Sequence, residues 1–203
     1  MKEQQTVKVV TIDPSAIGLF GLAMVTLVAS SQKLGWTAGT SGVLPWAIFL
    51  GAFAQLMAAA YDAKHNNVFG ATAFAGYGFF WLGVGMTWMI QNGLFGKVMQ
   101  TTFDPKQLAF AFLGYLAFTL IMTIGALETN KVLFVIFVLI DFLFIGLSLS
   151  TFGIAEHFFH QMAAYAELGI AIASFYGVAG NVLNKHFGYD FVPLGQPFGL
   201  LKK

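Results

Sequence analysis

The sequence has no cysteine and very little charge. Only 9% of its 203 residues are Asp, Glu, Lys or Arg, whereas soluble domains carry about 25%. The absence of cysteine excludes disulfides, thiolate metal sites and every enzyme with a cysteine nucleophile. All ten basic residues are lysines, and with nine scattered acidic residues they give a net charge of +1. No basic face is available to neutralise phosphates, so we expect no nucleic acid partner.

Apolar residues make up 58% of the chain, and its mean hydropathy is +0.76. A helix that crosses about 30 Å of hydrocarbon needs about 20 mostly apolar residues. Six such runs are present, over residues 16–32, 43–60, 68–90, 108–127, 132–151 and 161–182. The sequence therefore predicts an all-α integral membrane protein with six transmembrane helices. The short hydrophilic breaks predict one compact domain, 14–184, between tails 1–13 and 185–203.

The charge distribution predicts the orientation of this domain. Residues 1–15 lack the apolar stretch and cleavage site of a signal peptide, so we interpret them as a cytoplasmic tail. One side of the membrane would hold seven lysines: Lys2, Lys8, Lys64, Lys131, Lys185, Lys202 and Lys203. The other side would hold three, Lys33, Lys97 and Lys106. By the positive-inside rule, we expect a multi-pass protein of the cell membrane with both termini in the cytoplasm.

Uncharged polar residues inside the spans are candidates for a substrate pathway, because polar groups in hydrocarbon are costly. Gln55 lies in the middle of the second span and suits either a pathway or a hydrogen bond between helices. Tyr77 lies between two glycines in the third span, and its hydroxyl beside an apolar ring suits a constriction or ordinary aromatic packing. We also assign Ser174, in the sixth span, to the pathway.

Two carboxylates fall within the predicted spans. Asp141 lies about ten residues into the fifth span. It could carry a proton, or it could be a protonated residue bonded to a neighbouring helix or subunit. Glu167 lies nearer the end of the sixth span, where we expect it to be solvated.

The segment EHFFH, residues 156–160, places two histidines three residues apart in a predicted loop. A third or fourth ligand is not apparent, so we expect solvated histidines rather than a metal site. The sequence offers no Ser-His-Asp arrangement, phosphate-binding glycine loop or paired catalytic carboxylates. We therefore expect neither an enzyme nor a bound cofactor.

Several ordered motifs resemble those of one membrane protein family. The segment DPSAIGL, residues 13–19, is similar to the opening signature Asn-Pro-Ala-Pro-Leu-Gly-Leu of that family. Further similar segments are NVFG at 67–70, TAF at 72–74, YG at 77–78, FWL at 80–82, VLN at 182–184 and VPLG at 192–195. Together they resemble the acetate uptake transporters, also called the succinate-acetate permease or YaaH family.

This resemblance implies a homohexamer of six-helix protomers, each with its own pore. It further implies a narrow gate built by one residue from each of the first, third and fifth spans. By matching the motifs, these residues are Leu22, Tyr77 and Ile140. The opening motif, with Asp13, Pro14 and Gly18, would lie at the pore mouth. Asp13 stands where the family has Asn, which places a negative charge near that mouth.

The residues and the resemblance together predict transport of acetate and similar small monocarboxylates through a channel-like pathway. No lysine lies in the middle of a span, so hydroxyls, amides and helix amino ends would hold the anion weakly. One alternative is a proton-coupled acetate/succinate symporter that uses Asp141 or Asp13. Another is a membrane sensor or assembly protein that transports nothing. The expected partners are acetate, the lipid bilayer and further copies of the chain.

Overall fold

The computed structural model describes residues 13–201, and its regular elements there are all helices. The long helices are α1 (Ser15–Lys33), α4 (Val68–Gln91), α6 (Pro105–Ala126), α7 (Lys131–Thr151) and α8 (Glu156–Phe187). One further rod, over 44–64, consists of α2 (Leu44–Trp46), the π-helical segment η1 (Ala47–Ala54) and α3 (Gln55–Lys64). A short helix, α5 (Lys97–Thr102), lies between α4 and α6. The predicted tail 1–13 lies almost entirely outside the described residues.

Six of these helical stretches are long and apolar enough to cross a bilayer, as predicted. The predicted loop over 152–160 is confirmed for 152–155, which connect α7 and α8, and was wrong for the EHFFH segment, because α8 begins at Glu156. Its polar side chains occupy the first turns of a long helix, where water can reach them. The same helix continues to Phe187, three residues beyond the predicted end of the domain at 184.

Side-chain caps fix where several helices begin. Asn67 accepts a hydrogen bond from the backbone N–H of Gly70, 3.1 Å away, at the start of α4. Asn130 accepts one from the backbone N–H of Leu133, 2.9 Å away, at the start of α7. Such caps satisfy N–H groups that have no partner within the helix. Both caps lie at the same end of the bundle, beside the start of α1.

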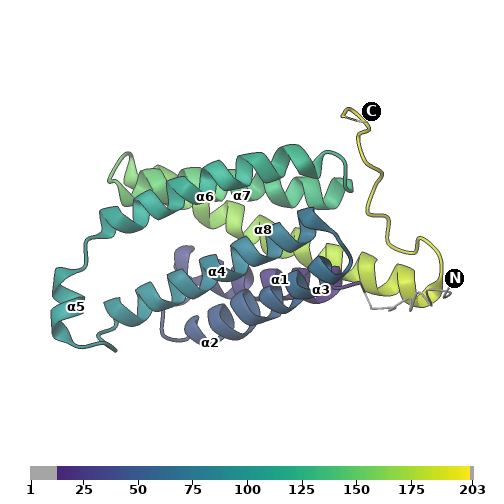
Figure 1. Cartoon of the computed structure of the whole chain (residues 1–203). Helices are drawn as coiled ribbons and strands as arrows, with labels where there is room; N and C mark the ends of the chain where they lie inside the picture. Colours follow the sequence, from purple (N-terminus) through teal and green to yellow (C-terminus); the bar gives the residue numbers. More distant parts are fainter. Residues whose placement is uncertain (1–12, 202–203) are drawn as a thin grey trace, which may run out of the picture.

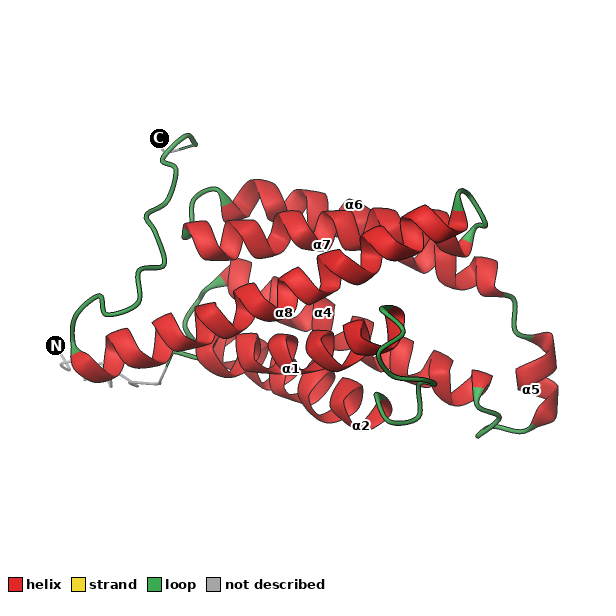
Figure 2. Cartoon of the chain, turned by 180° about the vertical axis from the view of Figure 1, so that it is seen from behind, coloured by secondary structure: helices red, strands yellow, loops and turns green. Residues whose placement is uncertain are grey.

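Helix α1 packs against α8, α3 and η1 (Figure 1). In turn, α8 packs against α7, and α7 packs against α6, which lies at the edge of the bundle (Figure 2). Two glycines allow close helix contacts: a Cβ atom at Gly21 would collide with the Leu50 carbonyl oxygen, and one at Gly146 with that of Phe159. These contacts bring α1 against η1 and α7 against α8.

Candidate substrate pathway

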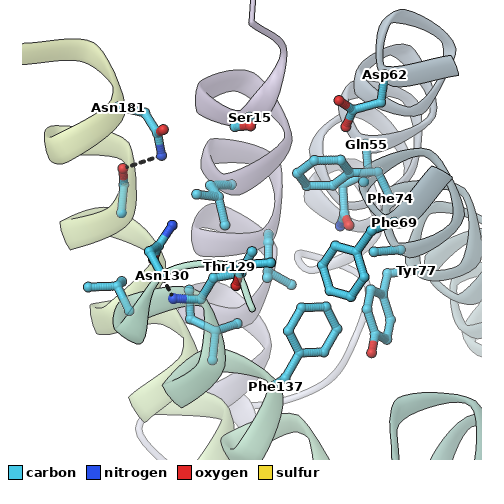
Figure 3. Close-up of a pocket in the computed structure, with 18 of the residues that line it drawn as sticks. Ser15, Gln55, Asp62, Phe69, Phe74, Tyr77, Thr129, Asn130, Phe137 and Asn181 are labelled. Carbon is cyan, nitrogen blue, oxygen red and sulfur yellow. Dashed lines mark hydrogen bonds between the residues drawn. The ribbon is translucent and has the colours of Figure 1, made fainter. Parts of the chain in front are cut away.

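A cavity of about 180 Å³ lies inside the bundle, at the end where α1 begins and α8 finishes (Figure 3). Its walls come from α1, α3, α4, α7 and α8, together with Leu194 of the C-terminal segment. Polar residues of the wall are Ser15, Gln55, Asp62, Asn67, Thr129, Asn130 and Asn181. No lysine is among the lining residues. The cavity is therefore a mixed polar and apolar space without a basic side chain.

Three helix amino ends meet at this cavity. Ser15 is the first residue of α1, Asn67 is the N-cap of α4, and Asn130 is the N-cap of α7. All three residues line the cavity. Because the amino end of a helix carries a partial positive charge and unpaired N–H groups, this arrangement favours an anion at the cavity mouth. The positive potential at this mouth thus comes from backbone rather than from lysine.

The three predicted gate residues all line the same cavity. Leu22 on α1, Tyr77 on α4 and Ile140 on α7 are 6%, 5% and 3% exposed. Two aromatic side chains, Phe69 and Phe137, join them in the wall, with ring centroids 5.5 Å apart. The structure therefore brings buried residues from the first, third and fifth spans together in the wall of one cavity.

The Tyr77 hydroxyl is engaged away from the cavity. It lies 3.0 Å from Oγ1 of Thr119 on α6, and that oxygen donates its own proton to the Tyr115 carbonyl at 2.7 Å. Since a threonine hydroxyl has one proton, Tyr77 must donate to Thr119. The Tyr77 ring packs against Phe118 and Phe137, with centroids 5.6 and 6.1 Å away. Tyr77 therefore offers the cavity its ring.

Gln55 lies at the junction between the π-helical segment and α3. Its Nε2 donates to the Gly51 carbonyl, 2.8 Å away, whereas its Oε1 is buried without a partner. The residue is fully buried and lines the cavity. Its free group is thus an acceptor, which cannot bond a bare carboxylate but can bond an O–H or N–H group.

The other predicted pathway residues lie outside the cavity wall. Ser174 on α8 is fully buried and its hydroxyl has no partner, but it does not line the cavity. Asp141 follows Ile140 on α7 and points to α6, where its Oδ2 lies 2.8 Å from the Thr123 hydroxyl. Gly18 packs against the Phe74 ring, where a Cβ atom would collide. The opening motif therefore helps to shape the wall, and neighbouring Ser15 reaches the cavity.

Asp13 stands outside the spans, just before α1. It accepts a hydrogen bond from the Ser15 backbone N–H at 2.9 Å, and its Oδ2 lies 3.6 Å from Nζ of Lys185. Partial burial acts to raise the pKa of Asp13, but the Ser15 hydrogen bonds and the Lys185 charge outweigh it and lower the pKa. Asp13 is therefore a carboxylate at neutral pH, and Lys185 at the end of α8 balances its charge.

Sequence reasoning missed Asp62, because the segment 61–67 reads as a hydrophilic break. In the structure α3 continues to Lys64, and Asp62 is 2% exposed and lines the cavity. Its Oδ1 accepts a hydrogen bond from Asn67 Nδ2 at 2.8 Å, and its Oδ2 has no partner. Asp62 could have been predicted from its spacing of seven residues from Gln55, which puts both residues on one face of a helix.

The expectation of a solvated Glu167 was wrong. Glu167 is 1% exposed, and its Oε2 lies 2.9 Å from Nζ of Lys33 at the end of α1. His160 Nε2 lies 3.2 Å from the Lys33 carbonyl oxygen. Because α8 begins at Glu156, Glu167 lies about three turns inside the helix, where it faces α1. This ion pair occupies the end of α1 opposite the cavity.

The segment after α8 folds back over the seam between α7 and α8. The Asn184 side chain forms two hydrogen bonds with the Val192 backbone, of 2.7 and 2.8 Å. The backbone N–H of Val132 donates to the Leu194 carbonyl at 3.2 Å. The Leu194 side chain packs against Gly180 and lines the cavity. The C-terminal segment is therefore part of the cavity wall.

Potential metal ligands do not cluster: across residues 13–201, no group of three or more His, Asp or Glu side chains could hold a metal ion. The histidines of EHFFH lie in the first turns of α8. The site consists instead of hydroxyls, amides, one carboxylate, helix amino ends and buried apolar side chains.

Comparison with known proteins identifies the family. The model of the GPR1/FUN34/yaaH family matches residues 2–197. The chain belongs to this family. It is 31% identical over 185 residues to the succinate-acetate/proton symporter SatP of Escherichia coli (strain K12), covering 91% of this chain and 95% of that protein. It is 28% identical over 197 residues to the accumulation of dyads protein 2 of Saccharomyces cerevisiae, covering 93% and 66%.

The fold is shared with a solved member of the family. The structure of the bacterial acetate channel SatP superposes with a TM-score of 0.84 at 28% sequence identity, covering 92% of this chain and all of that one. The six-helix architecture predicted from the sequence is therefore confirmed. The name of this structure refers to a channel, whereas the name of the Escherichia coli protein refers to a proton symporter.

Proposed function

We propose that this protein transports acetate and similar small monocarboxylates across a cell membrane. The observation that carries the proposal is the convergence of Leu22, Tyr77 and Ile140 on one cavity that three helix amino ends face. The family relationship supports it, since relatives are named for acetate or succinate transport. The protein is accordingly a membrane transporter and not an enzyme.

The pathway runs through each protomer, from the cavity across the constriction. A small carboxylate enters at the polar mouth, where the helix amino ends of α1, α4 and α7 hold it weakly enough to release it. At the constriction the substrate sheds water against Leu22, Tyr77 and Ile140. A two-carbon acid loses little hydration there, and larger or more strongly hydrated ions meet a higher barrier. Formate, propionate and succinate are lesser substrates.

The main proposal is a channel-like pathway, and a proton-coupled acetate/succinate symporter is the second candidate. The unpartnered Asp62 carboxylate oxygen at the cavity favours this second candidate, since a channel for anions has no need of a buried acid. A non-transporting sensor or assembly protein would show no flux.

We further propose that the protomers assemble as a homohexamer with both termini in the cytoplasm. The resemblance to the family carries this proposal. The outer face of α6 is compatible with it, because it exposes large apolar side chains that suit lipid or a neighbouring subunit: Phe110, Leu120, Ile121 and Ile124. Native mass spectrometry of the purified protein in detergent tests the subunit number. A monomer under conditions that preserve transport would contradict the assembly.

The transport proposal is tested by uptake of radiolabelled acetate into liposomes that contain the purified protein. Protein-free liposomes measure the acetic acid that crosses lipid unaided. We expect uptake above that background, reduced by Gln55→Ala, which removes a side chain of the cavity wall. Met57→Ala is the matched control, because Met57 lies on the same helix and is 47% exposed. Uptake no faster than through protein-free liposomes would refute transport.

A further inference from the structure

Asp62, a nearly inaccessible residue of the cavity wall, has one carboxylate oxygen without a hydrogen-bond partner. Asp62 lies in the last turns of α3, and its Oδ2 is buried and unbonded, while Oδ1 accepts from Asn67. Figure 3 shows the Asp62 carboxylate at the edge of the cavity, above Gln55. A buried carboxylate oxygen without a hydrogen bond is costly. Such an oxygen can accept a hydrogen bond from a ligand that carries an O–H or N–H group.

The charges around Asp62 do not supply that ligand. The groups that act on it electrostatically are Asp13, which has the same sign, and His65, which follows the last turn of α3. Lys185 faces Asp13 at 3.6 Å instead. The positive ends of α1, α4 and α7 meet at the same mouth. These amino ends stabilise one negative charge, and Asp62 already provides it.

A second carboxylate in this cavity would therefore meet a like charge in a poorly solvated space. The repulsion disappears if one proton is shared between the two groups, because an O–H···O⁻ hydrogen bond is among the strongest in proteins. Two carboxylates at one site commonly hold a single proton for this reason. The cavity thus fits a carboxylate together with a proton better than a bare carboxylate.

A second unpartnered acceptor lies deeper along the same helix. Gln55 Oε1 is seven residues before Asp62, about 10 Å along the helix axis, and both side chains line the cavity. An amide oxygen accepts a hydrogen bond from a protonated acid but not from its anion. Asp62 therefore lies nearer the polar mouth, and Gln55 lies nearer the proposed constriction.

We propose that Asp62 is the proton-binding residue of the pathway, and that acetate enters beside it as a pair sharing one proton. This inference rests on the proposed transport function and develops its second candidate, the proton-coupled symporter. Bulk water at the mouth supplies the proton, which forms an O–H bond at Asp62 Oδ2. When acetate binds, that bond breaks, a new O–H bond forms on acetate, and Asp62 returns to the carboxylate. Acetic acid then passes Gln55 and enters the apolar constriction without charge, where a bare anion would be costly.

The two carboxylates that sequence reasoning favoured for this role are placed differently. Asp141 does not line the cavity, and its Oδ2 contacts Thr123 at 2.8 Å. Asp13 bonds to the Ser15 backbone and faces Lys185. Asp141 is therefore the natural control for Asp62: it is a second carboxylate within a span, outside the substrate path.

The test compares acetate uptake into liposomes by wild type, Asp62→Asn and Asp141→Asn, with and without an inward proton gradient. After the rate in protein-free liposomes is subtracted, we expect the initial uptake rates of wild type and Asp141→Asn to rise as the outside solution is acidified, by up to about tenfold per pH unit. Asp62→Asn keeps the acceptor for Asn67 but cannot exchange a proton. Its initial uptake rate, corrected for the same background, should change by less than about twofold per pH unit.

A full pH dependence of the background-corrected rate in Asp62→Asn would overturn the inference, as would a wild-type rate that does not respond to pH. The latter outcome would leave acetate transport intact, whereas no uptake above protein-free liposomes would refute both. If Asp62→Asn does not fold, proton uptake by the detergent-solubilised wild type decides the question. A pH indicator in weak buffer should report close to one proton taken up for each acetate bound, and its absence would overturn the proposal.

Discussion

The Tyr77 hydroxyl lies 3.0 Å from Thr119 Oγ1, so the residue at the proposed constriction is tied to α6 by its polar end and faces the cavity with its ring. The two parts of this side chain therefore have separate tasks. The hydroxyl fixes the ring position, and the ring narrows the pathway. Each task can be removed separately by substitution.

Tyr77→Phe should keep acetate transport within about twofold of wild type, because the ring remains and Thr119 still donates to Tyr115. The lost hydrogen bond should lower the free energy of unfolding by about 1 kcal/mol. Tyr77→Ala should instead admit larger carboxylates by removing the ring. Uptake of acetate, propionate and succinate into liposomes separates the two variants, and a Tyr77→Phe variant that no longer transports acetate would show that the hydroxyl contacts substrate.

Ile140→Ala should widen the constriction and relax substrate selection. Pocket space for one methylene group changes the discrimination between two substrates by roughly tenfold. The propionate-to-acetate uptake ratio should therefore rise by about that factor. Ile172→Ala on α8 is the matched control, because Ile172 is 64% exposed whereas Ile140 is 3% exposed. An unchanged ratio in Ile140→Ala, measured alongside the control, would remove Ile140 from the gate. The substitution should also cost about 2 to 5 kcal/mol of stability.

The ion pair between Lys33 and Glu167 should behave as a unit. Lys33→Met alone leaves a buried carboxylate without its cation, which typically costs about 3 to 5 kcal/mol. Glu167→Gln alone leaves the cation unpaired and should cost a similar amount. The double variant should recover most of the loss, because replacing both partners of a buried pair is often neutral. Thermal unfolding in detergent measures this, and additive losses would mean that the two residues do not interact.

The pair between Asp13 and Lys185 should make a small, pH-dependent contribution to stability. Because the folded pKa of Asp13 is below its ordinary value of 3.8, the stabilisation is complete above that value and is lost as the pH falls through the folded pKa. Above pH 3.8, Asp13→Asn should unfold at a slightly lower temperature than wild type. The loss in free energy of unfolding should be that of an exposed ion pair, under about 1 kcal/mol. The difference should vanish on acidification. A difference that persists in strong acid would assign it to another cause.

The six spans were predictable because each is a long apolar run between hydrophilic breaks, and that pattern depends only on local sequence. The ends of the helices were harder to predict from the sequence. Polar residues such as Glu156 and His160 suggest a loop, yet a helix can carry them in its first turns, where water satisfies them. In the same way, Asp62 appeared to end a span, although α3 continues past it.

The partners of polar side chains were not predictable, because they come from distant parts of the chain. Lys33 and Glu167 are separated by 134 residues, and Tyr77 and Thr119 by 42. Motif matching placed Leu22, Tyr77 and Ile140 at the same cavity, since each motif fixes a position within its helix. Ser174 had no such anchor, and the structure places it outside the cavity wall.

The position of Leu194 has a consequence for synthesis of the protein. All six membrane helices precede it, yet its side chain forms part of the cavity wall and its carbonyl holds the start of α7. During translation all six membrane helices therefore leave the ribosome before this part of the wall exists. The cavity wall is completed only when the segment after α8 folds back onto the start of α7, so assembly of the site follows synthesis of the spans.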